Sequence, residues 1–230
     1  MTLFTSLRPP ASPPGIDLRC CDVADLLRDV RGARLVVADP PWRYDENPGG
    51  ANPEQSGIYA GLADVDIAAH LDAAYDCAAP SSRLAVWYTF PKAEEWRAVG
   101  MAGPRWGSPK TGGAWIKTGQ VGVGYHWRGQ AEPVAVWARG TTGRPGDLVL
   151  NGHVSTPGDH SEKPLEWLRA WVRAWTEPGD LVLDLYAGLA PLARACALEG
   201  RRYVGAEIDR DRHALALVRL RDAVALGGRS

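Results

Sequence analysis

The sequence predicts an α/β domain in which helices cover both faces of a mostly parallel sheet. Short apolar runs alternate with longer segments of helical periodicity. Runs that are apolar at nearly every position are typical of strands buried on both faces, and such strands come mainly from parallel sheets. A chain of 230 residues is long enough for one such domain. We therefore expect a single domain over residues 17–230, after a loose tail over residues 1–16 that is rich in Pro and Ser.

The expected elements alternate along the chain. The strands are Leu35–Ala38, Arg83–Thr89, Ala114–Lys117, Pro133–Ala138, Leu181–Asp184 and Arg202–Ala206. The helices are Ala63–Ala79, Pro91–Val99, Pro164–Trp175, Pro191–Glu199 and Asp211–Leu226. Asp209 or Asp211 is suited to cap the last helix. Trp167, Trp171 and Trp175 follow i, i+4, i+8 spacing, which favours a stripe packed against the sheet over a ligand-binding stripe.

The segment from Gly100 to Pro157 is expected to be an irregular insert, because it is rich in Gly, Pro and Trp. Most of it lies in a basic part of the chain: residues 92–145 carry a charge of +5, against −5 for residues 1–91 and −1 for residues 146–230. Such a middle is typical of a surface that contacts phosphates, and an ordinary solvated surface explains it equally well. The insert is therefore a candidate surface for contact with nucleic acid. The candidate nucleic-acid contacts are Arg105, Lys110, Lys117 and Arg128.

Other features exclude several classes of protein. No apolar run approaches the roughly 18 to 20 residues of a transmembrane helix, so we expect no membrane partner. The four cysteines form no CxxC pair and the histidines are scattered, so we expect neither a metal site nor a disulfide framework. These observations favour a protein of the reducing cytoplasm.

Asp39-Pro40-Pro41-Trp42 follows the apolar run Leu35–Ala38 directly. Prolines often end strands, so a rigid turn explains this stretch as well as an active site does. In an active site, the Asp39 carboxylate and the Pro40 carbonyl can accept hydrogen bonds from an amino group, and Trp42 can stack on a nucleobase. Such stacking contributes roughly 1–3 kcal/mol per base. The next residues, 44–47, are candidates to gate the pocket.

A second constellation runs from Leu181 to Arg212. One expected strand ends at Asp184, a turn with Ala187-Gly188 follows, and Glu207 ends the next strand. In nucleotide-binding βαβ units, an acid at this place accepts hydrogen bonds from ribose hydroxyls. A single glycine in the turn argues against a pyrophosphate and favours a ligand with adenosine but no phosphate, such as S-adenosylmethionine. A dinucleotide site and a crossover without a ligand are the alternatives.

Taken together, these stretches resemble the β-class DNA amino-methyltransferases. Asp39–Trp42 resembles their catalytic Asp-Pro-Pro-aromatic motif, and His160–Leu165 resembles their lysine-proline element. Asp184–Gly188 is similar to their Asp-Pro-Phe-Ala-Gly loop, and Gly205–Asp209 is similar to their Gly-Ile-Glu-Ile-Asp element. Cys21–Leu27 is similar to the segment whose aspartate contacts the cofactor adenine.

The resemblance implies a Rossmann-like methyltransferase domain with circularly permuted motif order. S-adenosylmethionine is then the cofactor, S-adenosylhomocysteine is the product, and no metal is required. The implied catalytic residues are Asp39, Pro40, Pro41 and Trp42. The implied cofactor-binding residues are Asp22, Asp39, Lys163, Asp184, Tyr186, Ala187, Gly188, Glu207 and Asp209. The chain departs from the family at Leu185, where proline is usual, and at residues 189–191, where Leu-Ala-Pro replaces Ser-Gly-Thr.

The resemblance also implies the activity: site-specific methylation of DNA at N6 of a flipped-out adenine. Three alternatives stay open. Cytosine N4 methylation uses the same chemistry, although that branch usually has Ser where this chain has Asp39. RNA is a possible substrate, because Trp42 and the segment around Arg128 and Glu132 resemble the RNA adenosine methyltransferases and their DNA-acting relatives. The third alternative is a non-catalytic subunit.

The implied partner is DNA, and the implied protein is cytoplasmic, bacterial or phage-encoded, and associated with the nucleoid. The insert over residues 100–157 is then the candidate for target recognition, and a homodimer is one arrangement that such a short recognition region permits. A place in a restriction-modification system is an expectation that the resemblance allows but does not require.

Overall fold

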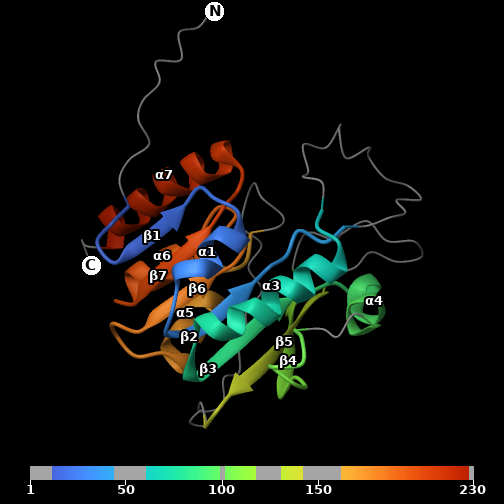
Figure 1. Cartoon of the computed structure of the whole chain (residues 1–230). Helices are drawn as coiled ribbons and strands as arrows, with labels where there is room; N and C mark the ends of the chain where they lie inside the picture. Colours follow the sequence, from blue (N-terminus) through green and yellow to red (C-terminus); the bar gives the residue numbers. More distant parts are fainter. Residues whose placement is uncertain (1–11, 44–60, 99–101, 118–130, 142–161, 228–230) are drawn as a thin grey trace, which may run out of the picture.

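The computed structural model describes residues 12–43, 61–98, 102–117, 131–141 and 162–227. These residues form one seven-stranded sheet between two layers of helices (Figure 1). The strands are β1 (Ile16–Arg19), β2 (Ala33–Ala38), β3 (Ala78–Trp87), β4 (Thr111–Ile116), β5 (Ala131–Arg139), β6 (Leu181–Asp184) and β7 (Arg202–Ala206). The helices are α1 (Val23–Asp29), α3 (Asp64–Cys77), α4 (Ala93–Ala98), α5 (Leu165–Trp175), α6 (Pro191–Leu198) and α7 (Arg210–Gly227), with a single 3-10 turn, η1 (Phe90–Lys92).

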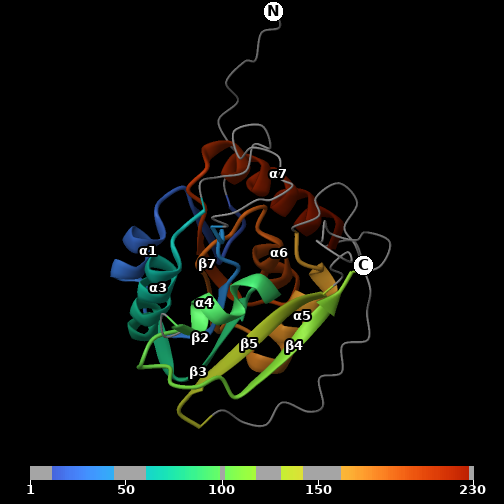
Figure 2. The ribbon, with the colours of Figure 1, turned by 90° about the vertical axis from the view of Figure 1, so that its right-hand side faces the viewer.

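The strand order is β1-β7-β6-β2-β3-β5-β4. Every neighbouring pair from β1 to β3 is parallel, whereas β5 runs antiparallel to both β3 and β4. Helices α1 and α3 cover one face of the sheet, and α5, α6 and α7 cover the other (Figure 2). The expected class, a mostly parallel sheet covered on both faces, is confirmed.

The tryptophan stripe of α5 packs in the core, as expected. Trp171 stacks on Trp87 of β3 with ring centroids 5.2 Å apart, and Trp167 lies 6.1 Å from the same ring. Trp175 stacks in turn on Trp171. These rings bind α5 to the centre of the sheet, which places the start of that helix beside the ends of β2 and β3.

Two elements at the start of the chain were not expected. Strand β1 alternates buried Ile16 and Leu18 with exposed Asp17, so it lacks the continuous apolar run of a central strand. Helix α1 has seven residues and begins at the capping side chain of Asp22, which accepts a hydrogen bond from the Ala24 amide at 2.7 Å. Both elements are too short for a periodic pattern to reveal them.

The described parts of the range 100–157 contain the two strands that the sequence predicted there, at Ala114–Lys117 and Pro133–Ala138. They contribute β4 and β5, which form the edge of the main sheet, so these parts belong to the domain framework. Some of the glycines and tryptophans that suggested loops lie in β4, which contains Gly112, Gly113 and Trp115.

The chain changes direction across the sheet between β2 and β6. From β2 it crosses through α3 to β3 on one side, and from β6 it crosses through α6 to β7 on the other. Strands β2 and β6 pair directly, with Val37 opposite Asp184, and the Leu185 amide donates to the Val37 carbonyl at 3.0 Å. In open α/β sheets, ligands bind outside the carboxyl ends of the strands at such a switch point.

Candidate functional site

Asp39 leaves the carboxyl end of β2 at this switch point, and the residues after it form a stiff turn. The Trp42 amide donates to the Pro40 carbonyl at 2.8 Å, and the Leu62 amide donates to the Pro41 carbonyl at 2.8 Å. The Trp42 indole is anchored too: its Nε1–H donates to the Trp87 carbonyl at 3.3 Å. The ring is half-buried, with its edge against Trp96 at a centroid distance of 5.3 Å. The turn predicted for Asp39–Trp42 is therefore present, and it holds the aromatic ring in place.

Lys163 points at the Asp39 carboxylate from the segment before α5. Its ammonium pairs with Asp39 Oδ2 and lies 3.1 Å from Glu132 Oε2 at the start of β5. Glu132 Oε1 pairs in turn with Lys117, at the end of β4. Burial lowers the pKa of Lys163, but Asp39 and Glu132 outweigh this, so its pKa is raised overall. Burial raises the pKa of Asp39, and the Lys163 ammonium opposes that shift.

Glu162, the neighbour of Lys163, anchors this segment on the other side. Its side chain is 1% exposed and pairs with Arg194 of α6 and, at 2.7 Å, with Arg219 of α7. Adjacent residues therefore reach in opposite directions, one into the helical layer and one into the site.

Asp184 ends β6 as a buried carboxyl group. The Tyr203 hydroxyl donates to its Oδ2 at 3.0 Å, and Gly205 leaves room for that hydroxyl, because a Cβ there would lie 2.2 Å from it. Burial raises the pKa of Asp184 to about 7, and the nearby charge of Asp39 adds to the shift. The two acidic strand ends predicted from sequence are thus close enough to influence each other.

Glu207, at the end of β7, is oriented by backbone amides. Gly188 donates to its Oε2 at 2.8 Å and Asp209 donates to its Oε1 at 2.9 Å. A carboxylate has about four acceptor positions, so both oxygens keep capacity for further donors. Asp209 itself accepts from the amides of Asp211 and Arg212, which confirms it as the cap of α7.

The unusual turn Leu189-Ala190-Pro191 packs into the core. Leu189 and Ala190 are buried, and Ala190 has a left-handed backbone with φ of 52°. The Ala190 amide donates to the Ala187 carbonyl at 2.7 Å, and Pro191 opens α6. Backbone hydrogen bonds therefore close this turn without the Ser and Thr hydroxyls that the family usually has.

Tyr186 of the same loop meets α3. Its hydroxyl lies 3.0 Å from His70 Nδ1. Burial raises the pKa of the Tyr186 hydroxyl, and the carboxylates of Asp22 and Asp66 add to the effect. The structure thus brings Asp22 near Tyr186 while Asp22 also caps α1. His70 carried no sequence signal, since a single histidine in a helix gives none.

The candidate nucleic-acid contacts separate in the structure. Lys117 lies at the site edge, paired with Glu132. Arg105 lies at the other end of the sheet, where it pairs with Asp72 at 3.0 Å and Asp76 at 2.7 Å in the last turns of α3. Lys110 is exposed before the start of β4, at the opposite end of that strand from Lys117. Arg128 and residues 44–47 lie outside the described residues.

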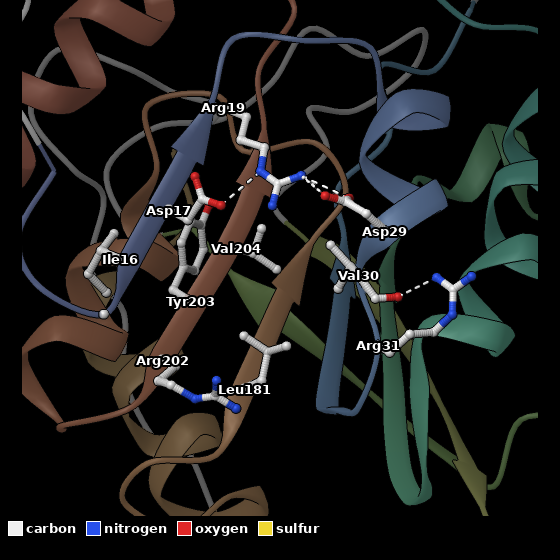
Figure 3. Close-up of a pocket in the computed structure, with 11 residues that line it drawn as sticks. Ile16, Asp17, Arg19, Asp29, Val30, Arg31, Leu181, Arg202, Tyr203 and Val204 are labelled. Carbon is white, nitrogen blue, oxygen red and sulfur yellow. Dashed lines mark hydrogen bonds and ion pairs between the residues drawn. The ribbon is translucent and has the colours of Figure 1, made fainter.

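A surface groove of about 400 Å³ lies elsewhere on the molecule (Figure 3). It is lined by β1, the first residues of β6 and β7, and the end of α1, where Arg19 pairs with Asp17 and Asp29. None of the described candidate site residues lines it. Among the described residues there is no group of three or more His, Cys, Asp or Glu arranged to hold a metal ion. Within the same ranges, no helix is long and apolar enough to cross a membrane.

Solved structures that share this fold include proteins named as DNA methylases and DNA methyltransferases. The chain superposes on TTHA0409 of Thermus thermophilus, named as a putative DNA modification methylase and complexed with S-adenosyl-L-methionine, with a TM-score of 0.64 and 19% identity over 90% of this chain and 94% of that one. It superposes on the PvuII DNA methyltransferase, which is cytosine-N4-specific, with a TM-score of 0.62 and 13% identity over 94% and 95% of the two chains. Identities this low show a shared fold.

Comparison of the amino-acid sequence points to one family of methyltransferases. Residues 105–218 match the N6_N4_Mtase family, described as DNA methylase. A Type II methyltransferase, M.XycI of Xanthomonas campestris pv. cyanopsidis, is 32% identical over 96 residues. That stretch is 42% of this chain and 31% of the relative, so the match spans about a third of the curated relative's length. The family match and the relative both support a DNA amino-methyltransferase of the N6/N4 family, as the motifs indicated.

Proposed function

We propose that this protein methylates DNA at the exocyclic N6 amino group of adenine, with S-adenosylmethionine as the methyl donor. The observation that carries the proposal is the meeting of the two motifs at the switch point: Asp39 ends β2 and Asp184 ends β6, on adjacent parallel strands. A methyl donor and an amino acceptor have to meet in line, so the residues that hold them must lie side by side.

The residues around the Asp184–Gly188 loop fit the proposed cofactor. Glu207 is held by two amides and keeps acceptor positions for ribose hydroxyls. Gly188 has φ of 55° and adds no side chain to the loop, and Ile208 leaves an apolar side chain 64% exposed beside Glu207, where a purine ring could lie. When bound, the cofactor supplies a methyl group activated on a sulfonium. The other cofactor contacts predicted from sequence, Asp22 and Asp209 among them, remain part of this proposal. Lys163 was also predicted to hold the cofactor, but its ammonium pairs with Asp39 and Glu132, so we assign it to the acceptor side.

The chain's contribution to the chemistry centres on Asp39. An exocyclic amino nitrogen is a weak nucleophile, because its lone pair is delocalised into the ring. Hydrogen bonds from the amino group to Asp39 and to the Pro40 carbonyl would favour tetrahedral nitrogen and free that lone pair. The nitrogen would then accept the methyl group as the carbon–sulfur bond breaks, with the electron pair of that bond left on sulfur, and it would release one proton to solvent. The anchored Trp42 ring would stack on the flipped base.

Cytosine N4 is the second candidate acceptor. A neighbour with the same fold is named as cytosine-N4-specific, and the chemistry at the amino group is the same. Asp39 favours adenine, because the resemblance assigns Ser to this position in most cytosine-specific relatives.

The test is to express the chain in a bacterium that lacks DNA methylation, and to map modified bases by a sequencing method that distinguishes N6-methyladenine from N4-methylcytosine. We expect N6-methyladenine at one short site. Asp39→Ala should abolish the signal, whereas Asp76→Ala, a matched change at the far end of α3, should leave it unchanged. Methylated cytosine would replace the adenine assignment, and a signal that survives Asp39→Ala would overturn the role of Asp39.

A further inference from the structure

Four charged side chains of alternating sign line the edge of the site. Lys117 follows β4, Glu132 is the second residue of β5, Lys163 precedes α5 and Asp39 follows β2. Each contacts the next, from Lys117 to Glu132, to Lys163, to Asp39. We propose that Glu132 is a positioning residue for methyl transfer: it holds the Lys163 ammonium against one oxygen of Asp39, so that the other oxygen faces the amino group of the base.

Three of these four charged side chains are largely buried, so each depends on the contact with its neighbour. The side chains of Lys163, Lys117 and Glu132 are 8%, 17% and 19% exposed, whereas Asp39 is 37% exposed. Charges this deeply buried require partners, and removing one member leaves its neighbour uncompensated. Two lysines and two carboxylates sum to zero charge, so the set can be buried together. The most exposed member is the one that has to meet substrate.

A lysine alone would not fix the Asp39 carboxylate. Its ammonium is a point charge on a flexible four-carbon stem and has no preferred direction of approach. Glu132 supplies a second contact, because its Oε2 lies 3.1 Å from Lys163 Nζ. The ring of Trp87 supplies a third, with its centroid 5.3 Å from the same nitrogen. The contact with Asp39 is made through Oδ2.

Lys117 acts on Glu132 in the same way. It pairs with Oε1 while Lys163 pairs with Oε2, so the two carboxylate oxygens are held from opposite sides. The aromatic ring of Trp115, 4.9 Å from Lys117 Nζ, supports that lysine. This gives Lys117 a role inside the protein, in place of or beside the phosphate contact expected from sequence.

The inference rests on the proposed methyl transfer, so wild-type activity on DNA is measured first. Glu132→Gln keeps the shape of the side chain and removes its charge. We expect kcat to fall about 10- to 100-fold, the loss typical of a misplaced reacting group. The dissociation constant for S-adenosylhomocysteine, measured by calorimetry, should change less than about threefold, because Glu132 does not lie at the Asp184–Gly188 loop. Glu166→Gln, an exposed change on α5, is the matched control and should leave kcat unchanged.

Lys117→Gln separates positioning from DNA binding. If Lys117 acts through Glu132, a double variant that carries both Lys117→Gln and Glu132→Gln loses no more activity than Glu132→Gln alone. If Lys117 contacts phosphate instead, Lys117→Gln raises the KM for DNA, and it does so in the Glu132→Gln background as well. That result would refute the role of Lys117 in holding Glu132. Thermal unfolding of every variant checks that the fold is retained.

The outcomes are distinguishable. A wild-type chain that binds S-adenosylhomocysteine but methylates no DNA removes the proposed function, and this inference with it. An active wild type with an equally active Glu132→Gln variant overturns the inference alone. A parallel loss of cofactor affinity and kcat would also overturn it, because Glu132 would then act on the cofactor side.

Discussion

The two halves of the site are built in different ways. On the proposed cofactor side, the carboxylate of Glu207 accepts hydrogen bonds from amides of Gly188 and Asp209, which lie in or next to the same βαβ unit. On the proposed target side, Asp39 pairs with Lys163, a residue far along the chain, and Lys163 pairs with Glu132. The first half is local and uses backbone groups, whereas the second is assembled from side chains of separate elements.

This difference explains why the residues around Glu207 were easier to predict from sequence than the partners of Asp39. Backbone amides have to approach at short range, so they impose a compact motif such as Asp184–Gly188 followed by Glu207. Ion pairs need only the right residue type at the right place in the fold, so their partners can stand anywhere in the chain. The comparison predicts that changes on the target side act through charge and long-range support, and that changes on the cofactor side act through local hydrogen bonds.

The largest effect on stability is expected at Glu162, which supports the target half. Glu162→Gln leaves Arg194 and Arg219 facing each other without a buried counter-charge. We expect the free energy of unfolding to fall by about 3–5 kcal/mol, measured by urea titration. Glu166→Gln, whose side chain is 66% exposed, should change it by less than about 1 kcal/mol. Equal effects for the two variants would contradict the anchoring role of Glu162.

Glu207→Gln tests the local half. A Gln side chain has one acceptor oxygen, so the amide of Gly188 or of Asp209 loses its partner. An unsatisfied buried amide costs about 1–3 kcal/mol, and we expect the variant to unfold at a lower urea concentration and to bind S-adenosylhomocysteine more weakly. Calorimetry gives the affinity. Unchanged affinity would show that Glu207 serves the turn and not the cofactor.

Asp184→Asn tests the cost of burying a carboxyl group at the end of β6, near the charge of Asp39. The pKa of Asp184 is about 7 in the fold against an ordinary 3.8, so ionising it disfavours the folded state. Its contribution to stability is full below the ordinary pKa and is lost as the pH rises through about 7. The variant should therefore gain in melting temperature over wild type, by about 2–4 °C, at about pH 8 but not at about pH 4. The same difference at both pH values would refute the shifted pKa.

The smallest effect is expected at Tyr186→Phe, which restores the family's aromatic residue. The ring is retained, and only the hydroxyl that meets His70 is lost. A single hydrogen bond of this kind contributes about 0.5–1.5 kcal/mol, so we expect a small decrease in stability and near-normal affinity for S-adenosylhomocysteine. His70→Ala in the same background should then add little, because the pair acts as one unit. A large loss of affinity would assign the hydroxyl itself to the cofactor.

Much of the fold followed from the sequence, with errors that have a physical cause. The central strands were visible because strands buried on both faces are apolar at nearly every position. Strand β1 was not visible, since it is an edge strand with one exposed face and only four residues. Within the expected insert, the strands at Ala114–Lys117 and Pro133–Ala138 were visible as well. The first half of β4 was not, because Thr111–Gly113 lack the apolar side chains of a buried strand.

By itself, the sequence determined the class of sheet, the two acidic strand ends and the order of the motifs, because burial and short-range backbone geometry leave a mark on neighbouring residues. Only the tertiary structure decided which cations serve the site. Arg105 and Lys117 were equal candidates in the sequence, yet Arg105 pairs with Asp72 and Asp76 on α3 whereas Lys117 joins Glu132 beside Asp39. A salt bridge depends on where two elements meet in space, and the spacing of charges along the chain does not record that.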